Sequence, residues 1–199
     1  CIAFYSGASM NFEPNWNSLD SRPTPQWFKD AKFGIFIHWG LYSVPAWGPK
    51  GSYAEWYLNG LNNGDTARLR YHEENYGKDF SYWQFIDLFK ADHYDPDKWA
   101  TLFKRSGAKY VVLTSKHHDG FCLWPSKQSG GYNSVSGAAG RDLLGDLNAS
   151  LKKVGLKSGL YYSLYEWDHP YYPENVSDYV DKYMLPQFKD VVQRYKPSI

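Results

Sequence analysis

The segment Lys32-Phe33-Gly34-Ile35-Phe36-Ile37-His38 decides the fold, because it is a short apolar run that is rich in β-branched and aromatic residues and ends in a polar side chain. Runs of this composition, roughly four to eight residues long, are typical of buried β-strands. Two more occur at Lys109–Ser115 and Leu156–Ser163. The sequence therefore predicts three buried strands, the first of which covers Lys32–His38.

Helical patterns lie between and after these runs. The predicted helices are Tyr82–Ala91, with Ser81 and Gln84 spaced as a capping box; Pro96–Ser106, capped by Asp95 and ended by Gly107; an apolar-striped helix capped by Asp142 and closed by Gly155; and a helix that Pro186 opens and Pro197 stops. Strands that alternate with helices predict a parallel sheet with crossover helices.

Two α/β architectures fit this alternation, a doubly wound sheet and a barrel. The first strand is followed by the aromatic loop Trp39–Pro45 in place of a Gly-rich phosphate-binding turn, which favours the barrel. Eight-stranded barrels take about 250 residues. We therefore predict a truncated (β/α)8 TIM-like barrel with the first three β/α units present and with Ile199 as the first residue of a fourth strand. By alternation, we expect Ile35, Val111 and Leu113 to face the barrel interior.

The composition is that of an ordinary globular chain of 199 residues with 22 Lys and Arg, 21 Asp and Glu, and a net charge of +1. No basic run suggests a nucleic-acid partner, and no apolar stretch reaches the roughly 20 residues of a membrane span. Aromatic residues reach 19%, and many lie beside Gly, His and charged residues. This mixture is typical of carbohydrate sites, although an aromatic-rich core explains the composition equally well.

The first residues carry features of a targeting segment. Cys1 opens a short apolar stretch, and we interpret residues 1–14 as a leader, signal remnant or N-terminal segment in which Cys1 ends a cleaved signal or bears a lipid. We assign residues 15–199 to the N-terminal part of one barrel domain. Cys122 is the only other cysteine, so a disulfide framework does not hold the fold together. The expected location is extracytoplasmic.

Polar and aromatic side chains follow each predicted strand. They are His38 after the first, Lys116–Asp119 after the second, and Tyr161–Ser163 leading to Glu166–Asp168 after the third. Because barrel enzymes build their sites at the carboxyl ends of strands, we expect these residues to share one rim.

Two chemistries suit the histidines at this rim. Asp119 beside His117 and His118 suggests a metal site, whereas imidazoles among aromatic rings suggest recognition of sugar hydroxyls. Adjacent residues at a strand end point to opposite sides, which should keep His117 and His118 from sharing an ion. The pattern therefore favours hydroxyl recognition.

Several motifs together resemble glycoside hydrolase family 29, the α-L-fucosidases, over about Asn15 to Ile199. They are Trp27-Phe28, Lys32–Gly40, Ser43–Pro45, Ala54–Tyr57, Ser115–Phe121, Arg141–Leu143 and Gly159–Ser163. The resemblance implies a fucose pocket with Trp56 at its side. The side chains that it implies for binding the sugar hydroxyls are His38, Glu55, His117, His118 and Tyr161. Phe36 lies two residues before His38 and so faces the same way; contact with the methyl group of fucose and interior packing are equal alternatives for it.

The resemblance also implies a retaining exo-glycosidase with an Asp nucleophile and a separate acid/base carboxylate about 5 Å away. In the family the nucleophile follows a helix that ends in Tyr-x-Pro, and Tyr195–Ile199 ends this chain. We therefore expect both catalytic carboxylates beyond Ile199, Glu55 to act in binding, and no metal or cofactor. The expected partner is a fucosylated oligosaccharide or glycoconjugate, and a homo-oligomer is compatible with the sequence. The alternatives are a non-catalytic fucose-binding protein and, third, a metal-dependent hydrolase.

Overall fold

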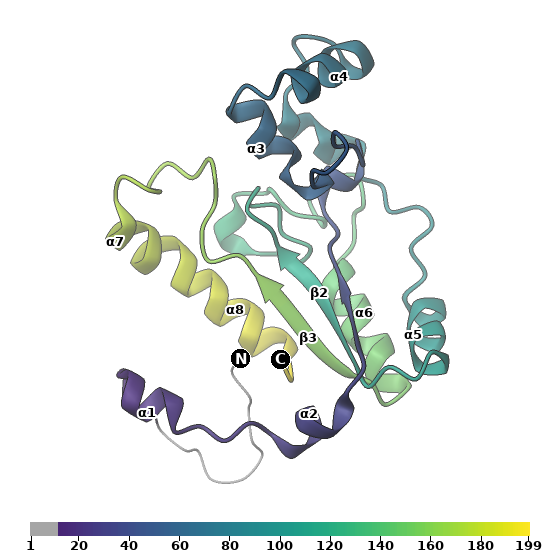
Figure 1. Ribbon diagram of the computed structural model, residues 1–199, viewed down its shortest axis with the longest axis vertical. Coiled ribbons are helices and arrows are strands. Elements are labelled where there is room, and N and C mark those ends of the chain that lie inside the picture. Colours follow the sequence, from purple (N-terminus) through teal and green to yellow (C-terminus); the bar gives the residue numbers. More distant parts are fainter. Residues whose placement is uncertain (1–11) are drawn as a thin grey trace.

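The computed structural model describes residues 12–199 and contains a three-stranded parallel sheet of order β1-β2-β3 (Figure 1). The strands are β1 (Gly34–Ile37), β2 (Tyr110–Lys116) and β3 (Lys157–Tyr162). Each lies within or overlaps the run that predicts it, so the α/β class and the parallel sheet are confirmed. The predicted leader falls mostly on residues 1–11, outside the described part. Among residues 12–199, no helix is long and apolar enough to cross a membrane.

Helices cover one face of this sheet. They are α5 (Pro96–Arg105), α6 (Leu143–Lys153) and α8 (Leu185–Tyr195). Val111 and Leu113 of β2 are only 1% and 2% exposed and join Leu147 of α6 and Val191 of α8 in the hydrophobic core, against which Ile35 also packs. These strand residues were expected to face the barrel interior, and that expectation is wrong. Alternation separates the two faces of a strand but does not say which face the helices cover.

The other elements lie at the two ends of the sheet. In Figure 1, α1 (Trp16–Asp20) and α2 (Gln26–Ala31) lie near the amino ends of the strands, and α3 (Tyr57–Asn62) and α4 (Thr66–Tyr76) lie beyond the arrowheads. The remaining short elements are η1 (Leu41–Ser43), η2 (Ala54–Trp56), η3 (Tyr82–Asp87), η4 (Lys127–Ser129), α7 (Val176–Asp178) and the π-helix η5 (Tyr179–Met184). The helices α3 and α4, which follow β1 in the chain, therefore lie beyond the carboxyl ends of the strands.

Side-chain caps begin several helices where the sequence predicts them. The reciprocal capping box of Ser81 and Gln84 starts η3, which is a 3-10 helix and ends at Asp87, before the predicted end. Asp95 accepts a hydrogen bond from the Lys98 amide at α5, and Asp142 accepts one from the Gly145 amide at α6. Each carboxylate thus satisfies an amide that has no partner within its own helix.

The last helix begins within one residue of the predicted start. Helix α8 starts at Leu185 and has Pro186 in its first turn, as expected, but the sequence did not predict the helical segment α7 and the π-helix η5 that lead into it from Val176. A proline lacks the amide donor that an α-helix interior uses, and π-turns and helix beginnings are where such a gap is accommodated.

The outer edge of β3 is paired with the end of the chain. The Ser198 amide donates to the Ser158 carbonyl at 2.7 Å, and the Leu160 amide donates to the Ile199 carbonyl at 2.9 Å. These two hydrogen bonds place Ser198 and Ile199 beside the outer edge of β3.

The buried face of α6 provides a stability test. Leu147 is 1% exposed, whereas Leu102 of α5 is 60% exposed. We expect Leu147→Ala to lower the free energy of unfolding by about 2 to 5 kcal/mol because it leaves a cavity, and Leu102→Ala to change it by less than about 0.5 kcal/mol. Urea titrations followed by circular dichroism measure both. Equal effects of the two substitutions would show that α6 does not pack as described.

Candidate functional site

A bulge in β2 decides which side chains meet at the end of the sheet. Thr114 pairs with Tyr161 and Lys116 pairs with Tyr162, so β2 advances two residues while β3 advances one. Lys116 therefore lies on the side of Tyr162, with its ammonium 4.4 Å from that ring. The next residue, His117, lies on the opposite side with Tyr161. Without the bulge, strict alternation would place Lys116 there instead.

Three histidines and a tyrosine then form one cluster, which we call the histidine cluster: His38, His117, His118 and Tyr161. The ring of His117 is 5.4 Å from that of His38 and 5.8 Å from that of Tyr161, measured between centroids. His38 and Tyr161 are 5.2 Å apart. The structure thus brings together four of the predicted site residues, from the ends of all three strands.

His117 and His118 do not point to opposite sides, contrary to the expectation from the sequence. Their ring centroids are 4.4 Å apart. The alternation rule fails here because β2 ends at Lys116, so the two histidines lie in the turn that follows the strand and not in extended backbone.

Phe36 borders the cluster on the face of the sheet opposite the helices. Its ring stacks on His38 at 5.0 Å and meets Tyr161 edge-on at 5.9 Å, and the side chain remains 53% exposed. The prediction that Phe36 and His38 face the same way is confirmed. An exposed phenylalanine beside polar rings leaves an apolar contact surface at the edge of the cluster.

Glu55 and Trp56 reach the cluster from η2. Trp56 lies 6.0 Å from the His118 ring, and Glu55 is close enough to His38 to favour the charged form of that imidazole. The buried Arg68 of α4 fixes the preceding loop, since its guanidinium bonds the Tyr53 carbonyl at 2.9 Å and also contacts Ser52 and Asp65. Among residues 12–199, no hydrogen bond or ion pair engages the Glu55 carboxylate, which leaves it available to a ligand.

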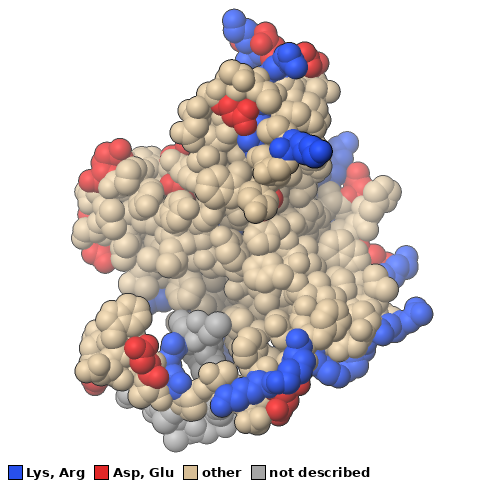
Figure 2. All heavy atoms as spheres, in the orientation of Figure 1, with Lys and Arg blue, Asp and Glu red and all other residues tan. Residues whose placement is uncertain are grey.

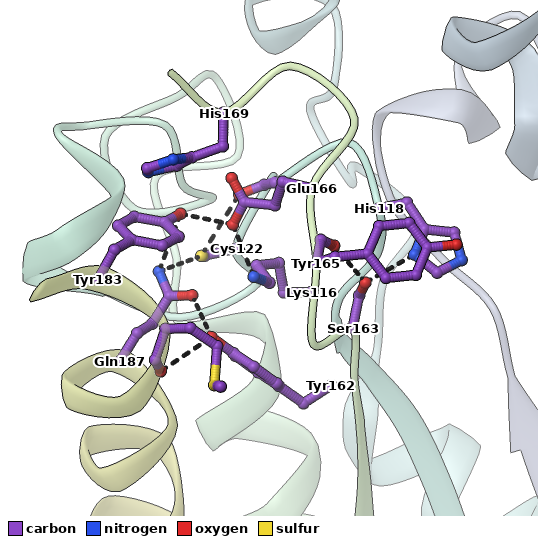
Figure 3. Close-up of polar contacts among 12 residues, drawn as sticks. Lys116, His118, Cys122, Tyr162, Ser163, Tyr165, Glu166, His169, Tyr183 and Gln187 are labelled. Atoms are coloured by element: carbon purple, nitrogen blue, oxygen red, sulfur yellow. Dashed lines mark hydrogen bonds and ion pairs between the residues drawn. The ribbon is translucent and has the colours of Figure 1, made fainter. Parts of the chain in front are cut away.

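A buried ion pair fixes the loop that contacts the histidine cluster (Figure 3). Lys116 donates to Glu166 at 2.6 Å, and the Tyr183 hydroxyl donates to the same carboxylate at 2.6 Å. The Lys116 side chain is fully buried, so its charge requires this partner. The pair ties the end of β2 to the loop after β3, and that loop returns to the cluster where the Trp167 amide donates to the His118 carbonyl at 2.9 Å.

Burial keeps the three imidazoles neutral near pH 7. Burial, followed by the neighbouring His118 and His38, lowers the pKa of His117 to about 3. Burial is also the main cause that lowers the pKa of His118, followed by the charge of Lys116, and it lowers the pKa of His38 against the opposing effect of Glu55. A neutral imidazole offers one hydrogen-bond donor and one acceptor, which suits hydroxyl groups better than anions.

Asp119 does not share a site with the histidines. Its carboxylate accepts hydrogen bonds from the Tyr82 hydroxyl at 2.6 Å and from the Phe121 amide at 3.2 Å. Burial raises the pKa of Asp119 to about 6, although both of these hydrogen bonds lower it. In the described part of the chain, no three His, Cys, Asp or Glu side chains are arranged to hold a metal ion.

Two aromatic residues behave differently from the sequence expectation. Trp167 was not among the predicted site residues, yet its ring lies 5.1 Å from His118 and 5.3 Å from Trp56. Its position after the third strand was the available signal. Trp39 directly follows His38 in the aromatic loop, but it packs on the helix-covered side, where its ring centroid lies within about 5.5 Å of the rings of Phe89, Tyr94 and Trp99.

One face of the molecule carries few charged side chains. In Figure 2, Lys, Arg, Asp and Glu side chains gather along the edges of the face in view, and the central surface carries almost none. Long-range attraction for a polyanion is therefore weak on this face.

The opposite pKa shifts of His117 and Asp119 predict opposite effects of pH on stability. Between about pH 6.5 and pH 3 the unfolded chain binds a proton that folded His117 does not, so His117 makes the free energy of unfolding fall as pH falls. Between about pH 3.8 and pH 6, folded Asp119 holds a proton that the unfolded chain has lost. Asp119 therefore makes the free energy of unfolding fall as pH rises through this range.

We therefore expect His117→Gln to lose less stability than the wild type when pH falls from about 6.5 to 4.5, and Asp119→Asn to lose more. Urea unfolding at each pH measures the three slopes. Parallel curves for the wild type and both variants would contradict the assigned protonation states.

Known proteins share much of this sequence and fold. The family model described as alpha-L-fucosidase matches residues 3–199. The alpha-L-fucosidase of Dictyostelium discoideum is 45% identical over 96% of this chain and 44% of its own length, and the human tissue alpha-L-fucosidase is 44% identical over 94% and 41%. The crystal structure of Thermotoga maritima alpha-fucosidase in complex with fucose matches with a TM-score of 0.84 and 43% identity, over 94% of this chain and 48% of that one. This chain thus spans less than half the length of these relatives, and it belongs to the alpha-L-fucosidase family.

Proposed function

We propose that the histidine cluster binds the α-L-fucose residue of a fucosylated glycan or glycoconjugate, as part of a retaining exo-glycosidase. The observation that carries this proposal is His117, which is 4% exposed and whose Nδ1 atom has no hydrogen-bond partner in the described part of the chain. A buried polar atom without a partner costs about 1 to 3 kcal/mol. A sugar hydroxyl held in the cluster would remove that cost.

The chemistry of the surrounding side chains supports a polyol. Three neutral imidazoles and the Tyr161 hydroxyl provide both donors and acceptors, and Glu55 adds an acceptor that two adjacent hydroxyls could share. Trp56 and Trp167 supply flat apolar faces for the C–H groups of a pyranose. The solved relative that contains fucose is 43% identical to this chain over the aligned region, which supports the choice of sugar.

Phe36 suits the 6-deoxy character of fucose. Its exposed ring lies beside the polar atoms of His38 and Tyr161, where a methyl group could pack while the neighbouring hydroxyls are bound. An added hydroxyl at this carbon would find no partner on the ring, although apolar pockets discriminate against one hydroxyl by only about 100-fold.

The reacting carboxylates are, in this proposal, supplied from beyond Ile199. Four carboxylates in the loops after the strands have other roles: Asp119 and Glu166 are bound to Tyr82 and Lys116, Asp168 accepts a hydrogen bond from Asn62 at 2.6 Å, and we assign Glu55 to binding. The chain would then form the first three units of a (β/α)8 barrel, with the strand after β3 beginning at Ser198 and Ile199. We also propose an extracytoplasmic location.

The placement of the nucleophile is tested by chain length. We expect residues 1–199 to show no turnover of an aryl α-L-fucoside, because displacement at the anomeric carbon needs a carboxylate on the face opposite the leaving group. We expect a protein extended from its own gene through the rest of the barrel to hydrolyse it with retention. Comparable turnover by the two would refute the proposed placement, and binding without hydrolysis by the extended protein would indicate a non-catalytic fucose-binding protein.

The role of the histidines is tested in the extended protein. We expect His38→Ala to lower kcat/KM about 30-fold or more, which corresponds to about 2 kcal/mol of lost hydrogen bonding in the transition state. His93→Ala is the matched control, because His93 is an exposed histidine outside the cluster. If both substitutions left kcat/KM unchanged, the histidine cluster would not be the sugar site.

A further inference from the structure

A buried serine connects His118 to the loop that follows β3. The Ser163 hydroxyl oxygen lies 2.6 Å from His118 Nδ1 and 2.5 Å from the Tyr165 carbonyl oxygen, and the side chain is 2% exposed (Figure 3). Both distances are those of strong hydrogen bonds. The direction of the proton in each contact is determined by the chemistry of the three groups.

A serine hydroxyl has one hydrogen, and a carbonyl oxygen only accepts. At 2.5 Å, the two oxygens of Ser163 and Tyr165 would repel each other unless that hydrogen lay between them, so Ser163 donates to Tyr165. Ser163 then presents only lone pairs to His118. The hydrogen in the 2.6 Å contact must therefore belong to His118 Nδ1.

Near pH 7 the imidazole of His118 is neutral and carries only one proton. Burial lowers its pKa most, the charge of Lys116 adds to this, and the Tyr165 carbonyl opposes it. A neutral imidazole that is protonated on Nδ1 carries a free lone pair on Nε2.

From this geometry we propose that Ser163 is a positioning residue that fixes His118 as the Nδ1–H tautomer, so that Nε2 accepts a hydrogen bond from a hydroxyl group of the sugar. The proton on Nδ1 follows from the contacts of Ser163, and the free lone pair on Nε2 follows from the neutral state of the buried imidazole. The partner of Nε2 rests on the proposed function. A substrate hydroxyl bound here must donate its proton to the protein, which restricts how the hydroxyls of the sugar can be oriented.

The loop that carries Ser163 and Tyr165 is held at both sides of His118. The Ser163 amide donates to the Lys116 carbonyl at 3.0 Å, and the Trp167 amide donates to the His118 carbonyl at 2.9 Å. Between them, Glu166 is bound by Lys116 and by Tyr183, each at 2.6 Å. The Tyr165 ring stacks on the His118 ring at 4.5 Å. These contacts keep the acceptor in place while Nε2 stays available.

His72 provides an internal reference with the opposite tautomer. Its Nε2 lies 2.7 Å from the Phe80 carbonyl oxygen, which only accepts, so Nε2 carries the proton. Its Nδ1 then accepts from the Tyr57 hydroxyl at 3.0 Å. The two histidines are therefore expected to give distinct patterns in one spectrum.

The test is long-range ¹H–¹⁵N correlation spectroscopy of the ¹⁵N-histidine-labelled chain at about pH 7.5, above the ordinary histidine pKa of about 6.5. The chain has six histidines, and single His→Gln variants assign His118 and His72. We expect the coupling pattern of an Nδ1–H imidazole for His118 and of an Nε2–H imidazole for His72. An Nε2–H pattern for His118 would overturn the proposal.

Addition of L-fucose in the extended protein separates this proposal from the proposed function. We expect the ¹⁵N signal of His118 Nε2 to move toward that of a hydrogen-bonded acceptor while Nδ1 stays protonated, and D-glucose to leave it unchanged. An Nδ1–H imidazole that does not respond to saturating L-fucose would refute fucose binding at His118 and leave the tautomer assignment standing.

Substitution of Ser163 tests its positioning role. In the extended protein, we expect Ser163→Ala to reduce the Nδ1–H population of His118 and to lower kcat/KM about tenfold, the value of roughly one net hydrogen bond. Ser163→Thr keeps the hydroxyl and should retain the tautomer. Ser106→Ala is the control, because the exposed Ser106 hydroxyl donates to the Phe103 carbonyl at the end of α5. An unchanged His118 tautomer in Ser163→Ala would contradict the role of Ser163.

Discussion

The bulge between Thr114 and Lys116 is the constraint on which the rest of the site depends. It turns Lys116 toward Tyr162 and Glu166, and it turns His117 toward His38 and Tyr161. One extra residue thereby separates a charged network on one side of the sheet from a neutral cluster on the other. Bulges that re-aim side chains are common beside active sites.

The charged network and the neutral cluster support each other. Lys116 and Glu166 are both buried, and loss of one partner of such a pair costs about 3 to 5 kcal/mol. Their contact fixes the loop of residues 163–167, which holds His118 through Ser163 and Trp167. Because the Lys116 charge also disfavours a proton on His118, the network contributes both the position and the neutral state of that imidazole.

Much of this arrangement could be predicted from the sequence. Apolar runs indicated all three strands, and the two-residue spacing of Phe36 and His38 indicated that they share a face, because both signals depend on local periodicity. The bulge could not be predicted, since Thr114-Ser115-Lys116 contains no glycine or proline that would mark it. The face of Val111 and Leu113 was predicted wrongly, because alternation alone does not identify the helix-covered side. The ion pair of Lys116 with Glu166 joins residues 50 positions apart and has no local signal. Helix α4 was also missed, because its exposed polar surface gives no apolar stripe.

The central claim is that the neutral histidine cluster is a binding site for fucose. A crystal structure of the extended protein soaked with L-fucose tests this most directly. The account predicts one pyranose within hydrogen-bond distance of His38, His117 and His118, with its methyl group against the Phe36 ring. A sugar bound elsewhere with the cluster left unchanged, or a sugar in the cluster with its methyl group directed away from Phe36, would contradict it.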